Sequence, residues 1–298
     1  MRTLGIDLGG TQIKCGVVEN GSIIEERVCD TPAGGYKAVV SCMARQARLL
    51  MEKCAGTEYV GVGTPGLIDT AAGIVRYSNN IGWHDAPVRA DLETLLGRPV
   101  RIANDAQCAA LGEALYGAGR GCDRMAMLTV GTGVGGGFVR DGELETDGYG
   151  SMAYIFGHSI IAYDGKLCNC GRRGCLEAYA SASAVAKRGE RVFVPPKSVR
   201  EIFEAARRED AVALGIVREF LDYLSAGVVN IANILRPRII VIGGGVSGSC
   251  DMILPVLNEA LKRGVYGYEY APVRAVCAEL GNCAGLAGAA SLWRGKNI

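Results

Sequence analysis

Three cysteines and one histidine stand close together near the middle of the chain, and these residue types can bind a metal ion. His158 is followed, after nine residues, by Cys168-Asn-Cys170-Gly-Arg-Arg-Gly-Cys175. Zinc prefers four nitrogen and sulfur ligands at the corners of a tetrahedron, and glycines between the cysteines permit tight turns. The spacing predicts a Cys3His zinc site, with a disulfide pair or three idle thiols as the alternatives. Four protein ligands leave no open position for water or substrate, so the predicted role of the ion is structural.

Two glycine-rich turns could bind phosphate, because each follows an apolar, strand-like run and leads into a second one. The turns join run 3–8 to run 13–18, and run 125–130 to run 138–139. Backbone N–H groups in such hairpins can surround a phosphate group. One glycine cluster alone can be only a tight turn, but two together predict a nucleotide held across a cleft, with one hairpin from each domain. The residues assigned to phosphate are Asp7, Gly9, Gly10, Thr11, Gly131, Thr132 and Gly133.

These turns differ from the fingerprint of a dinucleotide-binding Rossmann fold. Neither has the spacing Gly-x-Gly-x-x-Gly at the start of a helix, followed by an acidic residue about 20 positions later. A Rossmann fold is therefore disfavoured. Farther along the chain, apolar residues at helical spacing predict a core-facing helix over about 210–235.

A candidate catalytic carboxylate follows the apolar run 100–103. Asn104 and Asp105 stand there, immediately before an alanine-rich helical pattern that continues to Tyr116. A strand that ends where a helix begins presents both side chains at the helix N-terminus. From the residues alone, an N-cap pair and a catalytic pair are equally good interpretations.

Composition favours a globular enzyme that acts on small molecules. The chain has 298 residues, of which 49% are hydrophobic and 21% charged, with a net charge of +1. No strong field attracts nucleic acid or an anionic membrane, and the length suggests two domains. The start of the chain lacks a signal peptide, and no apolar run is long enough for a membrane span, so we expect a cytoplasmic protein. The nine other cysteines, at positions 15, 29, 42, 54, 108, 122, 250, 277 and 283, are scattered and are expected to be free, mostly buried thiols.

The cysteine cluster also resembles the signature of a known family. Gly157-His158, the three cysteines and the Leu176-Glu177 that follows them are similar to the zinc motif of the ROK family of repressors, open reading frames and sugar kinases. The two glycine hairpins resemble the phosphate motifs of the actin-like ATPase and sugar-kinase superfamily. A third cluster, after the apolar run 238–242, resembles its adenosine-side loop. That cluster contains Gly243, Gly244 and Gly245.

The resemblance implies an α/β fold of two actin-like, ribonuclease-H-like domains with a cleft between them. The expected N-terminal domain covers residues 1–117, and a final helix over about 286–298 packs back on it. The expected larger domain covers residues 118–285 and carries the zinc loop. Homodimers are common in this family, so the resemblance allows a homodimer.

The resemblance also implies an activity, namely transfer of the γ-phosphoryl group of ATP to a sugar hydroxyl, most often O6, with Mg²⁺ as cofactor. Asp105 matches the family's general base. The implied sugar-binding residues are Gly66, Asn80, Asn104, Asp105, His158 and Glu177. A repressor is disfavoured, because Asp7 already belongs to the first hairpin and no DNA-binding segment precedes it. A catalytically weakened sugar sensor and an N-acetylhexosamine kinase remain as alternatives.

One stretch departs from the family pattern. Most ROK kinases have Gly-Glu where this chain has Tyr154-Ile155, within the run Gly148 to His158. The family's glutamate contacts the sugar, and isoleucine cannot accept a hydrogen bond. We therefore expect glucose to be a poor substrate, unless Ile155 points into the core and other residues bind glucose normally.

Overall fold

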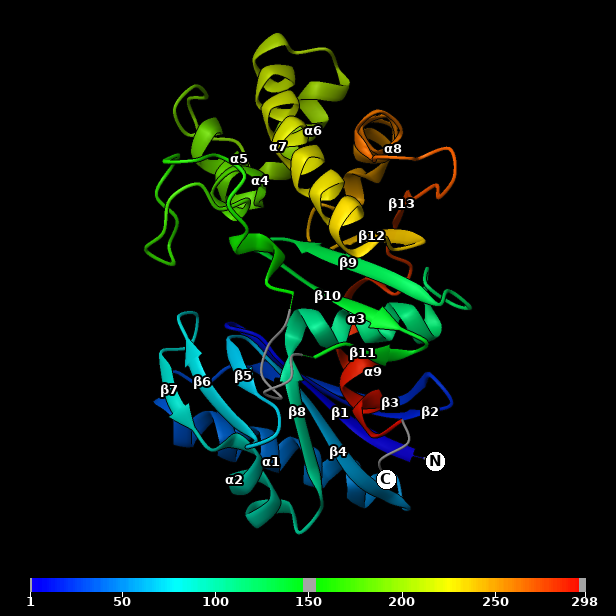
Figure 1. Cartoon of the computed structure of the whole chain (residues 1–298). Helices are drawn as coiled ribbons and strands as arrows, with labels where there is room; N and C mark the ends of the chain where they lie inside the picture. Colours follow the sequence, from blue (N-terminus) through cyan, green and yellow to red (C-terminus); the bar gives the residue numbers. More distant parts are fainter. Residues whose placement is uncertain (1, 147–153, 295–298) are drawn as a thin grey trace. The chain divides into compact units, whose positions relative to one another are not determined.

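The computed structural model describes residues 2–146 and 154–294 (Figure 1). The chain forms two compact units. Unit 1 combines Met1–Gly121, Gly137–Tyr154 and Asn282–Ile298, and unit 2 combines Cys122–Gly136 and Ile155–Gly281. Among the described residues, no helix has both the length and the apolar character that crossing a membrane requires.

A five-stranded mixed sheet forms the centre of unit 1, in the order β3-β2-β1-β4-β8. Strands β1, β2 and β3 are joined by short turns and pair antiparallel, whereas β4 and β8 run parallel to β1 because helices intervene in the sequence. Alternating apolar residues of β1, such as Leu4 and Ile6, are completely buried. The strands are β1 Arg2–Leu8, β2 Gln12–Glu19, β3 Ser22–Asp30, β4 Thr57–Thr64 and β8 Val100–Asn104.

Unit 1 also holds four helices and a small antiparallel sheet of order β5-β6-β7. The helices are α1 Gly35–Lys53, α2 Val88–Leu96, α3 Asp105–Tyr116 and α9 Ala284–Ala290. The small sheet consists of β5 Leu67–Asp69, β6 Ile74–Ser78 and β7 Trp83–Ala86.

Helix α9 packs tightly against strands β1 and β4. A Cβ atom on Gly5 would lie 2.4 Å from the Leu286 carbonyl oxygen, and one on Gly61 would lie 1.8 Å from that of Ala289, so both positions require glycine. The helix expected over 286–298 is shorter than predicted, because α9 ends at Ala290 and one 3-10 turn, Ser291–Trp293, follows. Residues 295–298 lie outside the described residues.

A second five-stranded sheet has the order β11-β10-β9-β12-β13. Strand β12 runs parallel to both of its neighbours, β9 and β13, whereas β10 and β11 pair antiparallel. The strands are β9 Arg124–Val130, β10 Val134–Arg140, β11 Glu143–Leu144, β12 Ile239–Gly243 and β13 Arg274–Cys277.

The helices of unit 2 include the longest described helix of the chain. Helix α7 spans Ala211–Leu235, as the apolar spacing predicts, and Asp210 caps its N-terminus. Helices α6, α7 and α8 lie on the same side of strands β9 and β12 (Figure 1). The helices are α4 Glu177–Ala180, α5 Ala182–Gly189, α6 Val199–Arg207, α7 and α8 Cys250–Gly264, with 3-10 turns η1 Phe156–His158 and η2 Ser247–Ser249. A further 3-10 turn, η3 Gly281–Cys283, begins at the last residue of unit 2 and continues into unit 1.

Candidate functional site

The fold brings together the four predicted metal ligands, all of them in unit 2. One ligand atom each from His158, Cys168, Cys170 and Cys175 lies within 4.8 Å of the others. Nδ1 of His158 is 3.7 Å from Sγ of Cys168, and the Sγ atoms of Cys170 and Cys175 are also 3.7 Å apart. A zinc–sulfur bond of about 2.3 Å places the sulfurs of a tetrahedral site roughly 3.8 Å apart. The cluster therefore fits a tetrahedral zinc ion.

The loop that carries these ligands depends on two left-handed glycines. Gly171 has φ of 81° and Gly174 has φ of 80°. A Cβ atom on Gly174 would lie only 1.9 Å from the carbonyl oxygen of Ala162. Burial, together with neighbouring thiols, raises the pKa of Cys175 to about 12. A thiolate at this position consequently needs a cation to stabilise it, which is what a bound metal ion supplies.

Glu177 connects the cysteine cluster to the second glycine turn. One carboxylate oxygen accepts a hydrogen bond from the Val134 N–H at 2.9 Å, and the other is 3.8 Å from Sγ of Cys168. A Cβ atom on Gly133 would lie 2.3 Å from the first oxygen, so a larger residue there would displace the Glu177 carboxylate. This link joins residues 43 positions apart, and sequence reasoning missed it.

The second glycine turn forms between β9 and β10 as predicted. Within it, the Gly131 N–H donates to the Gly133 carbonyl at 2.9 Å, and the Ala182 N–H of helix α5 donates to the Gly131 carbonyl at 2.8 Å. Thr132 is exposed at the tip. The start of α5 is therefore fixed directly to this turn.

The first glycine turn forms between β1 and β2, also as predicted. The Gly9 N–H donates to the Gln12 carbonyl, and the Thr31 hydroxyl donates to the Gly9 carbonyl, both at 2.8 Å. Gly10 and Thr11 are exposed. The turn thus leaves backbone at its tip accessible to a ligand.

Asp7 is the second-to-last residue of β1, and the first glycine turn follows directly after Leu8. Burial raises its pKa to about 6, the negative charge of Asp105 adds to the rise, and Lys14 opposes it. A Cβ atom on Gly285 would lie 2.8 Å from a carboxylate oxygen of Asp7, so glycine is needed beside it. The structure therefore brings the two predicted carboxylates of unit 1 close enough to repel each other.

Asn104 is the N-cap of helix α3, so the capping interpretation is correct for this residue. Its Oδ1 accepts hydrogen bonds from the N–H groups of Ala106 at 2.9 Å and Gln107 at 3.3 Å. Its amide nitrogen donates to the Gly66 carbonyl at 3.1 Å, which connects two of the predicted sugar-binding residues.

Asp105 is the first residue of α3, and one of its oxygens accepts from the Ala106 N–H at 2.9 Å. Burial raises the pKa of Asp105, while hydrogen bonds from backbone N–H groups and Asn104 act in the opposite direction. A carboxylate with a raised pKa binds a proton more readily than an ordinary aspartate. Asp105 has the chemistry of a general base.

Two other predicted sugar-side residues, Gly66 and Asn80, lie on separate turns. Gly66 has φ of 122°, and a Cβ atom there would lie 2.4 Å from the Tyr77 carbonyl, so this turn requires glycine. Asn80 lies in the exposed turn between β6 and β7. The structure therefore joins Gly66 to Asn104 but leaves Asn80 on a separate turn.

Tyr154 and Ile155 are both described, whereas residues 148–153 of the departing stretch lie outside the described residues. Tyr154 has φ of 62°, a left-handed conformation that glycine adopts without strain, and its hydroxyl donates to the Glu145 carboxylate. The side chain of Ile155 is 43% exposed. The alternative that Ile155 points into the core is therefore wrong.

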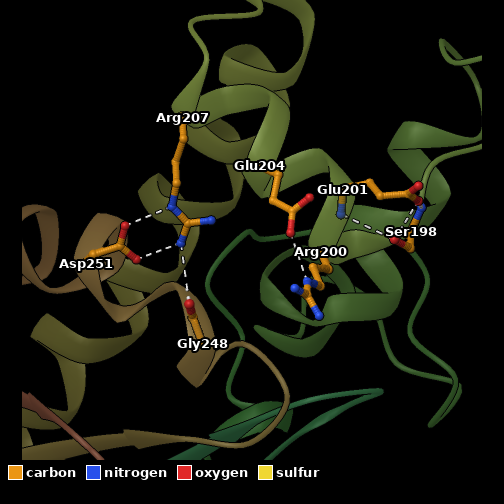
Figure 2. Close-up of polar contacts among 7 residues, drawn as sticks. All are labelled: Ser198, Arg200, Glu201, Glu204, Arg207, Gly248 and Asp251. Atoms are coloured by element: carbon orange, nitrogen blue, oxygen red, sulfur yellow. Dashed lines mark hydrogen bonds and ion pairs between the residues drawn. The ribbon is translucent and has the colours of Figure 1, made fainter.

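The third glycine cluster begins at the end of β12 and is followed by η2. Figure 2 shows how helix α6 contacts the residues that follow this cluster: both Nε and Nη2 of Arg207 donate to the carboxylate of Asp251 in α8, at 2.8 and 2.7 Å. Nη2 also donates to the Gly248 carbonyl at 3.4 Å (Figure 2). A Cβ atom on Gly244 would lie 2.6 Å from the Val130 carbonyl oxygen, so the segment also passes very close to β9.

The prediction that all nine scattered cysteines are free is wrong for two of them. Cys250 at the start of α8 and Cys277 at the end of β13 form a disulfide, with Cα atoms 6.1 Å apart. The parallel pairing of β12 and β13 places Cys277 opposite Ile242, and Cys250 follows β12 at the start of α8. The two cysteines are 27 residues apart in sequence, so local spacing cannot reveal that they meet. Cys283 is exposed rather than buried.

The chain is similar in sequence and structure to known sugar kinases. It is 37% identical to a glucokinase of Thermotoga maritima over 312 residues, which cover 98% of this chain and 97% of the relative. It is 36% identical to an N-acetylmannosamine kinase of Vibrio cholerae, covering 88% of this chain and 90% of the relative. A ROK glucokinase from Streptomyces griseus, solved in complex with glucose and AMPPNP, superposes with a TM-score of 0.85 at 34% identity, covering 98% of this chain and 99% of that one.

The likeness extends to the fold, because a ROK hexokinase structure from Thermus thermophilus superposes with a TM-score of 0.86 and covers 97% of each chain. The predicted fold class, α/β with two actin-like domains, is therefore confirmed. Residues 3–296 match the sequence profile of the ROK family. The match spans nearly all of the sequence, and the chain belongs to the ROK family.

Proposed function

We propose that this protein is an ATP-dependent sugar kinase, which transfers the γ-phosphoryl group of ATP to a hydroxyl group of a hexose, with O6 as the expected acceptor. The observation that carries this proposal is the pair Asn104-Asp105 at the head of α3, in a chain related over nearly its full length to glucokinases. The likeness to a structure with glucose and AMPPNP supports the same substrates.

In this reaction Asp105 acts as the general base. It accepts the proton of the attacking sugar hydroxyl while the hydroxyl oxygen bonds to the γ-phosphorus, the bond between that phosphorus and the β,γ-bridging oxygen breaks, and ADP leaves. The raised pKa of Asp105 favours the proton transfer. Asn104 uses Oδ1 for the helix cap and its amide for the Gly66 carbonyl. These bonds fix the turn that carries Gly66 relative to Asp105, so the sugar-binding backbone and the base are positioned together.

The glycine clusters are the proposed nucleotide site. Gly9, Gly10 and Thr11, together with Gly131, Thr132 and Gly133, supply backbone N–H groups for the phosphates, and Gly243, Gly244 and Gly245 lie beside the adenosine. Asp7 is proposed to hold a Mg²⁺ ion, directly or through its bound waters. Burial disfavours the ionised carboxylate and so raises its pKa, and a cation beside Asp7 would stabilise that negative charge. When bound, Mg²⁺ neutralises charge on the phosphate oxygens.

His158 and Glu177 are proposed to connect the zinc site to the sugar site. Nδ1 of His158 faces the cysteines, which leaves Nε2 to donate a hydrogen bond to a sugar hydroxyl. The Glu177 carboxylate is fixed by Val134, so it can accept a sugar hydroxyl without moving. A structural zinc ion on His158, Cys168, Cys170 and Cys175 would hold both side chains in place. Asn80 is the remaining proposed sugar contact.

An N-acetylhexosamine is the second candidate substrate. The exposed Ile155 offers an apolar contact where most of the family has a glutamate, and one relative at 36% identity is an N-acetylmannosamine kinase. We also infer a cytoplasmic enzyme, since its donor is ATP. The homodimer common in the family would leave the proposed reaction unchanged.

The test is ATP consumption by the purified protein over a panel of hexoses and N-acetylhexosamines, with sugar phosphate identified by mass spectrometry. The Asp105→Asn variant serves as the control for contaminating kinases. Turnover of one sugar by the wild type and not by the variant supports the proposal. If sugars bind in calorimetry but no phosphate is transferred, the protein is a sugar sensor.

A further inference from the structure

Unit 2 contains a cavity of about 240 Å³ whose wall along helix α5 has no role in the sites described above. It lies between the zinc loop, on the side of Lys166 to Asn169, and one face of helix α5. The polar side chains that matter for its chemistry are those of Thr132, Asn169, Ser183, Lys187, Arg188 and Arg191.

The cavity has more positive charge than its neighbours neutralise. Lys166 and Arg188, which line it, both pair with Glu219, at 3.1 and 2.8 Å. Lys187 and Arg191 line it as well, and neither side chain makes a hydrogen bond or an ion pair with any residue in the described part of the chain. Two cations are therefore available to a ligand.

The helix directs these groups to the same face. Ser183 and Lys187 are four residues apart on α5, and the turn that continues from it to Arg191 keeps helical hydrogen bonds, with the Glu190 N–H donating to the Ala186 carbonyl. Arg188 lies deeper: its side chain is only 10% exposed, and its Nε has no hydrogen-bond partner among the described residues. A buried donor without a partner indicates a missing acceptor.

The cavity is continuous with the second glycine turn. Thr132, at the tip of that turn, lines the cavity, and the first N–H of α5 is hydrogen-bonded to the Gly131 carbonyl at 2.8 Å. An anion bound by the backbone of the turn would thus have the free hydroxyls and cations of α5 directly beside it. Glu177 also lines the cavity, and its negative charge would repel a bound anion. The hydrogen bond from the Val134 N–H stabilises part of that charge.

We propose that this cavity binds the phosphoanhydride chain of the phosphoryl donor, extending the proposed phosphate site along α5. The inference rests on the proposed function. A volume equal to about eight waters at roughly 30 Å³ each suits a short chain of phosphoryl groups. The lining has no aromatic side chain on which a base could stack. Recognition is therefore by charge, and the chain can come from a nucleoside triphosphate or from inorganic polyphosphate.

The simplest competing explanation is that the cations only stabilise α5. Lys187 and Arg188 stand in its last turn, where positive charge interacts favourably with the helix dipole. In that case replacing Lys187 lowers the melting temperature and leaves ligand binding unchanged. The two explanations thus differ in a direct binding measurement.

The experiment uses the full-length zinc-loaded protein and titrates it with inorganic tripolyphosphate, ATP and adenosine in a calorimeter. The test variant is the double change Lys187→Gln and Arg191→Gln. The matched control, Lys262→Gln with Arg274→Gln, removes two exposed positive charges elsewhere in unit 2. Ser183→Ala provides a milder second variant, should the double variant unfold.

We expect tripolyphosphate to bind the wild type and the control equally, and the test variant about tenfold to a hundredfold more weakly, as the loss of charge-assisted hydrogen bonds predicts. The KM for ATP should rise similarly while the KM for the sugar and the affinity for adenosine stay the same. Sugar phosphorylation by polyphosphate identifies an inorganic donor, and phosphorylation by ATP alone identifies the nucleotide chain; both support the cavity's role.

Three results would overturn the inference: no tripolyphosphate binding by the wild type, equal binding by the test variant, or loss of adenosine binding in that variant. Its failure can be told apart from failure of the kinase proposal. If the test variant has normal ATP kinetics, the kinase proposal stands, and the cavity has no part in binding the donor. If tripolyphosphate binding depends on Lys187 and Arg191 but the protein phosphorylates no sugar, the cavity proposal stands and the kinase proposal is wrong.

Discussion

Replacing Asp7 by asparagine should stabilise the ligand-free protein while impairing turnover. The carboxylate is buried near Asp105, and its pKa in the folded protein is about 6, compared with 3.8 for an ordinary aspartate. Each pKa unit corresponds to about 1.4 kcal/mol, so holding this group ionised at neutral pH costs the folded state about 3 kcal/mol. Asparagine has nearly the same shape and carries no charge, so it avoids this cost.

The sign of the pH dependence follows from the raised pKa. Between pH 4 and pH 6 the folded protein keeps the Asp7 proton that the unfolded chain has lost, so the free energy of unfolding of the wild type falls as the pH rises through this window. Above about pH 6 both states are ionised and the full cost remains. The variant should exceed the wild type by up to about 3 kcal/mol at pH 7.5, and the difference should shrink toward zero near pH 4.

Urea unfolding of both proteins at several pH values, without nucleotide or Mg²⁺, measures this difference. Asp222→Asn, at an exposed position of α7, controls for the general effect of removing a negative charge. Equal or lower stability of the Asp7 variant at pH 7.5 would refute the reasoning, as would a difference that does not change with pH. ATP turnover in the same variant should fall, because the charge that destabilises the fold is the one proposed to hold Mg²⁺.

Four further outcomes are expected. Asp105→Asn should lower kcat by about 10²- to 10⁴-fold while ATP still binds, and the wild-type kcat/KM should decline on the acid side at a pH above 3.8, because burial raises the pKa of the base; a variant with half the wild-type kcat would contradict the assignment. Elemental analysis should find about one zinc per chain, and Cys170→Ser should lose zinc and stability together. Alkylation without reductant should leave Cys250 and Cys277 unmodified, and replacing Cys250 by serine should lower the unfolding free energy of the oxidised protein by about 3 kcal/mol. Tyr154→Gly with Ile155→Glu should raise kcat/KM for glucose about tenfold or more, and an unchanged value in a folded variant would show that these residues do not select the sugar.

The features that sequence reasoning predicted correctly are local. The glycine turns follow directly from strand-like runs, and the start of α3 follows from a capping residue before an alanine-rich segment. The zinc ligands lie within 18 residues, from His158 to Cys175, so their spacing nearly determines that they meet. In each case the interacting groups are neighbours in the chain, and their residue types alone restrict the possible geometry.

The features that sequence reasoning missed join distant segments. Nothing near Cys250 indicates that Cys277 is its partner, and nothing near Arg207 indicates Asp251. The positive charge on and just after α5 could not be predicted from the net charge of +1, because a net charge is a sum and does not say where charged residues lie in the fold. These contacts depend on how β12, β13 and the helices around them pack, and packing is determined by the whole chain.

The Glu177 contacts change what loss of zinc should do. The carboxylate lies 3.8 Å from the sulfur of Cys168, a proposed zinc ligand, and accepts a hydrogen bond from the backbone N–H of Val134 beside the second glycine turn. A side chain at position 133 would displace the same carboxylate. If the cysteine loop loosens, Glu177 moves, and the turn proposed to hold phosphate loses both a hydrogen bond and the wall against which it packs. An ion with no open coordination position can thus influence both substrates, because a single side chain contacts its ligand shell and the phosphate turn.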